Sequence, residues 1–246
     1  MRTSATQYTP HPLKNLSIIR SPQGKVKLAF PVYTPPFMAR CPLCTERSAK
    51  RFCPAKQTSI CAVCCGTKRE VEIDCPSSCV YLKSGRSYES ETRPLDPEVV
   101  ARARAFKPDF VSEYGPVLEV LGRAVAEERQ RSPWMVDPDI LEVYRALGAT
   151  MKTLSSGIYY ETLPEGPARI AVFRTLKAIL DSMMSPSDPQ QRALRVSEVV
   201  EILDFLFLAV SANSSGRPRS RRYLDWLSDM FQVAPPSPES GRLIIP

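Results

Sequence analysis

The residues that can do chemistry in this 246-residue chain are its eight cysteines, all of which lie between positions 41 and 79. A thiolate is a strong ligand for Zn²⁺, and four thiolates can close a tetrahedral structural site. The pairs Cys41/Cys44 and Cys61/Cys64 are two C-x2-C knuckles with sixteen residues between them. This spacing is typical of a zinc site with four cysteine ligands, so the sequence predicts that the two knuckles bind one ion.

The remaining cysteines form a second candidate set, which comprises Cys53, Cys65, Cys75 and Cys79. Because Cys53 lies between the two knuckles in the chain, the two sites would interleave in a cross-brace. Neighbouring side chains of an extended backbone point to opposite sides, so Cys64 and Cys65 can serve different ions, and spacing alone does not decide which. The spacing from Cys61 to Cys65 also suits a knuckle built on a helix. We therefore predict two Zn²⁺ ions held by all eight cysteines.

Three other uses of clustered cysteines fit this segment less well. An iron–sulfur cluster usually needs a tight run of several cysteines, which the chain lacks. A redox-switch zinc centre needs exposed sulfurs of low pKa and a resolving thiol, and the neighbours Cys64 and Cys65 provide proximity only. A core of buried cysteines needs apolar surroundings, whereas this segment is polar and too small to build a core without a metal.

The order of two early cysteines, an Arg-Phe-Cys-Pro step, Ile-Cys-x-x-Cys-Cys and a closing Cys-x3-Cys resembles the MYND and HIT zinc fingers over residues 39–82. This resemblance implies a small cross-braced module that binds two zinc ions and mediates protein–protein contacts. The chain departs from the pattern at Lys56, where those fingers have a cysteine, and it lacks their late histidine, so Cys64 would supply a missing ligand. The finger followed by helices also resembles uncharacterised bacterial proteins with the pattern ICxxCCGxxRxVxIxCPxxCxYL, which implies an architecture and no activity.

The net charge of +7 suggests acidic partners, but the finger's share of it changes when metal is counted. Residues 40–86 contain nine Lys/Arg and four Asp/Glu, which gives +5. Eight thiolates and two Zn²⁺ ions add −8 + 4 = −4, so the segment carries about +1. Much of the basic character therefore neutralises the metal cluster, which weakens the prediction of nucleic-acid binding.

Several classes of protein are disfavoured by what the sequence lacks. The single histidine, His11, is far from the cysteines, which argues against His-based triads and metal catalysis. The longest apolar run, residues 202–212, contains Asp204 and is too short to span a bilayer. No secretory signal is visible at the N-terminus, so we expect a cytoplasmic protein with reduced thiols and no membrane partner.

The chain is expected to have four parts. Residues 1–37 read as a flexible arm with a hairpin around Ser21–Gly24, and Met38 is an alternative start. Residues 38–84 are the cysteine-rich zinc-binding domain, residues 95–233 a helical bundle, and residues 234–246 a flexible tail. Helix starts are predicted at Asp-Pro steps, where Asp suits the N-cap and Pro the first turn; these steps are at 96–97, 137–138 and 188–189. A further helix should follow Gly166, and Val71 and Ile73 should share one face of a short strand.

Two further segments are candidate sites. The loop of residues 215–226 carries four arginines that could contact phosphate or RNA: Arg217, Arg219, Arg221 and Arg222. Alternatively they pair with acidic helix faces while Trp226 packs in the core. Near the middle of the bundle, small residues precede Tyr159, Tyr160 and Glu161, which predicts close helix packing or, alternatively, a ligand pocket.

The sequence thus predicts a mainly α protein, in which a small two-zinc cross-brace finger is followed by an antiparallel helical bundle. The favoured function is a non-catalytic zinc-binding protein with structural zinc that acts as a protein-interaction or adaptor module. The alternatives are nucleic-acid or ribosome binding through the finger and the basic loop, and a redox- or zinc-responsive regulator. Enzymatic activity is the least supported, and the sequence leaves the partner and the oligomeric state open.

Overall fold

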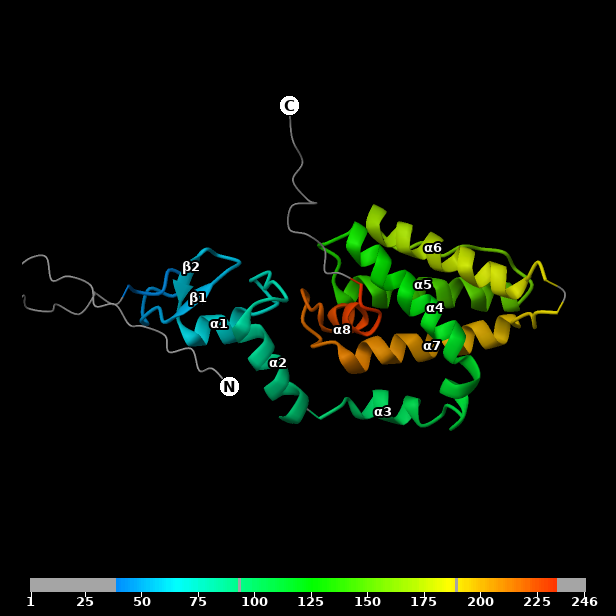
Figure 1. Ribbon diagram of the computed structural model, residues 1–246, viewed down its shortest axis with the longest axis horizontal. Helices are drawn as coiled ribbons and strands as arrows, with labels where there is room; N and C mark the ends of the chain where they lie inside the picture. The colour runs from blue at the N-terminus through cyan, green and yellow to red at the C-terminus, as the bar shows by residue number, and fades with distance from the viewer. Residues whose placement is uncertain (1–38, 93, 189, 234–246) are drawn as a thin grey trace, which may run out of the picture. The chain divides into compact units, whose positions relative to one another are not determined.

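The computed structural model describes residues 39–92, 94–188 and 190–233 (Figure 1). The predicted arm with its hairpin, the alternative start at Met38 and the tail lie outside these residues. The finger and the helices belong to one compact unit that begins at Arg40. None of the helices in the described part of the chain combines the length and the hydrophobicity that a membrane span requires.

The cysteine-rich segment is built from a two-stranded sheet and one short helix. Strand β1 (Arg51–Cys53) pairs antiparallel with β2 (Thr58–Ile60), and Arg51 lies opposite Ile60. Helix α1 (Ala62–Lys68) follows directly, which confirms the knuckle built on a helix. The strand predicted around Val71 is wrong, because Arg69 and Ile73 form only an isolated bridge. Ile73 is buried and Val71 exposed, so the two do not share a face.

Seven further helices make the described part of the chain mainly helical: α2 (Val80–Thr92), α3 (Pro97–Ala103), α4 (Phe110–Arg131), α5 (Asp137–Ser155), α6 (Pro167–Met184), α7 (Val196–Asn213) and α8 (Arg222–Met230). Helix α5 packs against both α6 and α7, and α3 lies along α7 (Figure 1). Helix α4 contacts α6 and α8. Apolar side chains at helical spacing fill one core among these helices, including the fully buried Leu147, Phe173 and Leu176.

The predicted helix starts are partly right. Asp96 caps α3 through its side chain, which accepts from the N–H of Glu98, and Pro97 begins the helix. Helix α6 begins after Gly166 as expected, with Gly166 at a φ of 90° that suits glycine. The start at Asp188 is wrong, because α7 begins only at Val196. Asp188 instead accepts from the N–H of Gln190 in a local turn.

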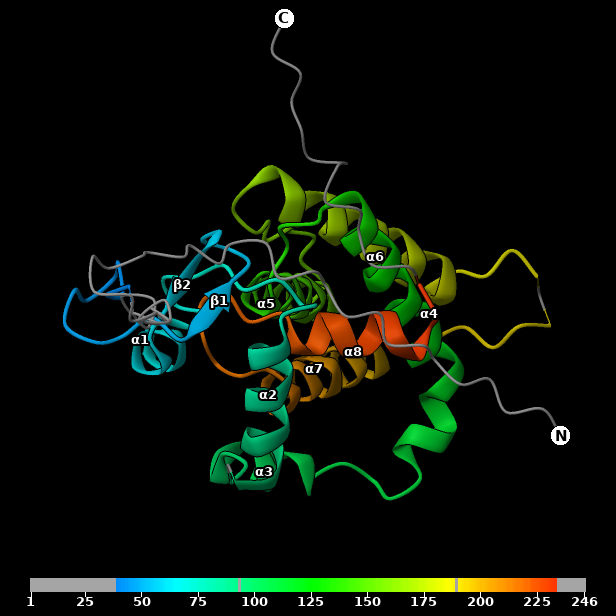
Figure 2. The same cartoon turned by 60° about the vertical axis from the view of Figure 1, so that its left-hand side comes forward.

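Asp137 is the first residue of α5 rather than its N-cap, which is Val136. Its buried carboxylate accepts from the backbone N–H groups of Tyr223 and Leu224, at 3.3 and 3.2 Å, in the first turn of α8. The hydroxyl of Ser220 donates to it at 2.6 Å. The first turn of a helix has N–H groups without partners in the helix, so α5 supplies the cap that α8 lacks. Figure 2 shows α5 nearly end-on with α8 beside it.

Candidate metal centre

Two local structures bring the knuckle cysteines together. A tight turn follows Cys41, in which the N–H of Thr45 donates to the carbonyl of Cys41 at 2.7 Å, and Thr45 has a φ of 57°. On the other side, Cys61 is the N-cap of α1, and its sulfur accepts from the N–H of Cys64 at 3.3 Å. The turn presents one cysteine pair, and the first turn of the helix presents the other.

The four sulfurs of Cys41, Cys44, Cys61 and Cys64 all lie within 4.8 Å of one another. Those of Cys44 and Cys61, one from each knuckle, are 3.9 Å apart. A Zn–S bond of about 2.3 Å in a tetrahedron puts the sulfurs about 3.8 Å apart, whereas a disulfide needs about 2.05 Å. The cysteines are free, and their arrangement can hold a metal ion.

The pKa values of these thiols differ, because burial, backbone hydrogen bonds and the neighbouring sulfurs act on each thiol to a different extent. Burial alone raises the pKa of Cys41, but hydrogen bonds from the backbone of Cys61, Leu43 and Cys44 outweigh it and lower the pKa to about 6. Backbone hydrogen bonds from Arg47 and Glu46 also lower the pKa of Cys44.

Cys64 behaves in the opposite way. Burial and the neighbouring sulfurs raise the pKa of Cys64 to about 12. Four thiolates repel one another at this separation, so the last proton leaves only when a cation neutralises the cluster. The donor set therefore fits a dication that prefers sulfur, and Zn²⁺ is the ion for which four thiolates are typical.

The structure brings Cys64, and not Cys65, together with the other knuckle. Among the described residues, the set of Cys41, Cys44, Cys61 and Cys64 is the only group of potential ligands this close together. Cys53 ends β1, Cys65 lies in α1, and Cys75 and Cys79 precede α2. Burial raises the pKa of Cys75, and the nearby sulfurs of Cys79 and Cys53 raise it further. Cys53, Cys75 and Cys79 are thus near enough to interact electrostatically, without the closeness of the first group.

Three of the four arginines of the basic loop contact other parts of the chain through their side chains. Arg217 donates to Glu89 of α2 at 2.8 Å. Arg221 is buried and pairs with Asp74. Arg219 donates to the carbonyl of Val71 at 3.2 Å. The Arg222 side chain has no ion pair among the described residues.

Two smaller predictions about aromatic residues are wrong. Trp226 is 45% exposed rather than part of the core. Helix α5 ends at Ser155, so Tyr159 and Tyr160 lie in the following loop and are 69% and 65% exposed. They are too exposed for close helix packing, because the helix that would have presented them stops first. Tyr159 donates to Glu161 at 2.8 Å on the surface.

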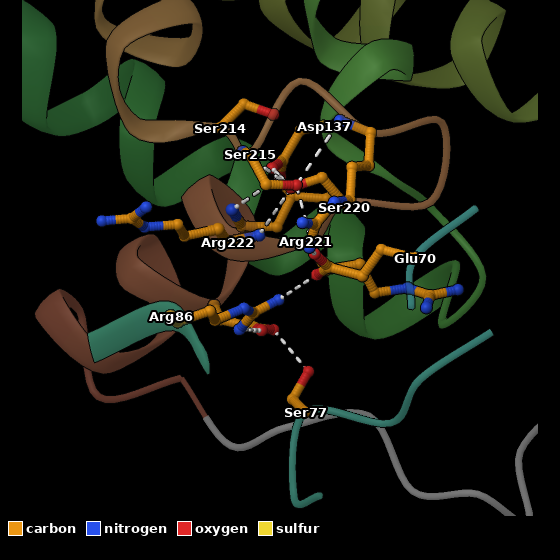
Figure 3. Close-up of polar contacts among 12 residues, drawn as sticks. Glu70, Ser77, Arg86, Asp137, Ser214, Ser215, Ser220, Arg221 and Arg222 are labelled. Atoms are coloured by element: carbon orange, nitrogen blue, oxygen red, sulfur yellow. Dashed lines mark hydrogen bonds and ion pairs between the residues drawn. The ribbon is translucent and has the colours of Figure 1, made fainter. Parts of the chain in front are cut away.

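A polar network that the sequence analysis missed joins the finger to the helices (Figure 3). Arg86 of α2 donates to Glu70 at 2.9 Å and to Asp225 of α8 at 2.6 Å. Ser77 donates to the same Asp225 at 2.8 Å, and Ser215 donates to Glu70 at 3.1 Å. The signal in the sequence is weak, because these residues are separated by up to 148 positions and no local spacing relates them.

Comparison of the chain with protein-family models, curated proteins and solved structures found no match. The resemblance to MYND and HIT fingers therefore rests on the order of the cysteines alone. What the fold and the geometry support is a mainly helical protein with a group of four cysteines that could hold a metal ion.

Proposed function

We propose that this chain is a non-catalytic zinc-binding protein with structural zinc that acts as a protein-interaction or adaptor module. The observation that carries the proposal is the group of four sulfurs within 4.8 Å of one another. Four thiolates fill a tetrahedral coordination sphere, whereas catalytic zinc keeps one position for water or substrate. Cys41, Cys61 and Cys64 are at most 5% exposed, which keeps a reacting molecule away from the ion.

The proposal includes a second zinc ion, held by Cys53, Cys65, Cys75 and Cys79. Cys65 follows Cys64 in α1, so its side chain leaves the helix about 100° further round and faces away from the first group. The electrostatic influence of Cys53 and Cys79 on Cys75 supports a shared site. Small shifts of the loop before α2 would bring these four sulfurs together around an ion. The two interleaved ions would then hold both ends of the finger in place.

A protein partner is supported by an exposed apolar segment between α5 and α6. Ile158, Tyr160 and Leu163 are 61%, 65% and 48% exposed, and Tyr159 lies between them at 69%. Adjacent exposed apolar side chains are a feature of protein-interaction surfaces, and tyrosine is enriched among residues that dominate such contacts.

The two alternative functions have less support. For nucleic-acid binding, Arg217 and Arg221 would have to leave Glu89 and Asp74. For a redox switch, an oxidant would have to act on a group in which Cys41, Cys61 and Cys64 are buried and only Cys44 is partly exposed.

The first experiment is native mass spectrometry of the purified chain with elemental analysis. We expect two zinc ions per chain, and one ion in Cys44→Ser and in Cys65→Ser. One ion in the unaltered chain would overturn the second site, and no zinc would overturn the proposal as a whole.

The partner is tested by affinity capture from the native cell after nuclease treatment. The chain carrying Ile158→Ser and Tyr160→Ser should lose the captured protein, whereas the chain carrying Val80→Ser should retain it, since Val80 is equally exposed at 66% but lies elsewhere. Loss of the partner with nuclease would instead support binding of nucleic acid.

A further inference from the structure

A cavity of about 370 Å³ lies where the finger meets α2 and the loop before α8. Three arginines line it, and they come from three separate segments: Arg51 from β1, Arg69 from the residue after α1, and Arg217 from the loop. Glu89 is the one carboxylate in its lining. The walls therefore carry three positive charges and one negative charge, which leaves a surplus of two positive charges.

The buried guanidinium of Arg69 is the main reason to expect an anion in this cavity. The residue is only 9% exposed, and its Nε–H has no hydrogen-bond partner in the part of the chain that the structure describes. Among the described residues, no carboxylate forms an ion pair with Arg69. A guanidinium remains charged in proteins, and burying a charge without a partner is strongly unfavourable. An anion in the cavity would supply what the chain itself does not.

Gly85 allows Arg69 to take this position. A Cβ built on Gly85, inside helix α2, would lie 1.5 Å from Nη1 of Arg69, so any larger residue would displace the guanidinium. Glycine inside a helix is otherwise unfavourable compared with alanine. The bare helix backbone at Gly85 therefore makes room for Arg69 beside the cavity.

The other two arginines are held in place but keep donors free. Arg217 is anchored by Nη2 on Glu89 at 2.8 Å, while its buried Nη1 makes no hydrogen bond and lies 3.7 Å from the carboxylate of Glu70. The guanidinium of Arg51 lies over the ring of Tyr81, 4.9 Å from its centre. Both side chains are thus oriented by contacts that do not use all of their N–H groups.

We propose that this arginine pocket, formed by Arg51, Arg69 and Arg217, binds a phosphate group. A phosphate dianion matches the surplus of two positive charges, and guanidinium groups bind phosphate oxygens with paired N–H donors. The cavity is larger than a phosphate ion, so it has room for a small phosphorylated molecule, and Tyr88 in its lining offers an aromatic ring to such a molecule. This site is separate from the metal centre and goes beyond the proposed function.

The test uses the full zinc-loaded chain at low ionic strength, with inorganic phosphate as the probe. Phosphate at 100 times its Kd should raise the Tm by about 5–10 °C, and potassium chloride at equal ionic strength should not. In Arg69→Gln the affinity for phosphate, measured by calorimetry, should fall at least tenfold, and the Tm without phosphate should rise because an unpaired buried charge is gone. Arg222→Gln, which lies outside the pocket, should bind phosphate as the unaltered chain does.

The outcomes separate the proposal from its competitors. A merely structural Arg69 would make Arg69→Gln less stable with and without phosphate alike, and that result would overturn the proposal. The proposal would also be overturned if phosphate did not raise the Tm of the unaltered chain, or if Arg69→Gln and Arg222→Gln lost equal affinity for phosphate. A nucleoside monophosphate that binds more tightly than inorganic phosphate supports a small phosphorylated molecule as ligand, and equal affinities support free phosphate. Zinc content should be unchanged in both variants, so failure of the pocket is distinguishable from failure of the metal centre.

Discussion

Glu70 and Arg86 form a buried ion pair, with Oε1 and Nη2 2.9 Å apart and side chains that are 1% and 14% exposed. Glu70 follows the helix of the finger at a positive φ of 54°, and Arg86 lies in α2. The other end of the Arg86 guanidinium meets Asp225 of α8. One arginine thus joins a carboxylate of the finger to a carboxylate of the last helix. Loss of this contact should therefore lower the free energy of unfolding of both parts.

Glu70→Gln should therefore destabilise the whole unit. The substitution keeps the shape of the side chain but removes a buried charge that Arg86, Ser215 and Arg217 surround. Hydrogen bonds to charged groups contribute about 1.5–3 kcal/mol, so we expect the free energy of unfolding, measured with urea, to fall by about 2 kcal/mol. The matched control is Glu119→Gln, because the ion pair of Glu119 with Arg123 is exposed. This substitution should change the free energy of unfolding by less than about 0.5 kcal/mol. Equal effects of the two substitutions would contradict the role of Glu70.

Removal of metal should unfold the finger and leave the helical core. On the proposed function, a strong chelator takes away the ion that stabilises residues 41–79, so their amides should exchange hydrogen at least about 100-fold faster. Amides around Leu147, which is buried in the core of the helices, serve as the internal control and should keep their protection. Added Zn²⁺ should restore the finger. Unchanged exchange in residues 41–79 after complete metal removal would show that the finger does not need the ion.

Zinc affinity should rise with pH. The bound cysteines are thiolates, whereas in the metal-free chain burial and neighbouring sulfurs raise the pKa of Cys64 to about 12, so binding at neutral pH must release its proton. We expect at least a tenfold gain in affinity per pH unit between pH 6 and 8. Below about pH 6, where the pKa of Cys41 lies, the dependence should become steeper because the Cys41 proton must leave as well. Competition titrations with a chromogenic chelator measure this, and a flat profile would exclude a thiolate site.

Acid should weaken the helical domain through Glu198. Hydrogen bonds from Arg195 lower the pKa of Glu198 to about 2, against the cost of burial, and the hydroxyl of Tyr114 assists. A carboxylate whose folded pKa is lowered stabilises the fold above its ordinary pKa near 4.5, and this stability is lost as the pH falls toward 2. Glu198→Gln should flatten the decrease of the urea midpoint between pH 5 and 3. Glu201→Gln, on the exposed side of the same helix, should leave that decrease unchanged, and a similar flattening there would contradict the assignment.

The sequence predicted what depends on local spacing and missed what depends on distant contacts. The knuckle of Cys61 and Cys64 and the Asp96 cap each involve residues two or three positions apart, so their geometry follows from turn and helix periodicity. The Arg217 contact with Glu89 spans 128 positions, and packing of the helices decides it. For the same reason the exposure of Trp226 could not be predicted from its helical periodicity, because the neighbouring elements determine which face is covered.

Asp137 carries a consequence for the order in which the chain is made. Its carboxylate caps α8 across 86 positions of sequence, and α8, at nine residues, is too short to persist alone in water. Asp225, the anchor of Ser77 and Arg86, lies in that helix. During synthesis the finger therefore emerges first, and more than a hundred further residues must follow before its anchor exists. In that interval, on the proposed function, the zinc held by its own cysteines keeps the finger folded without this anchor.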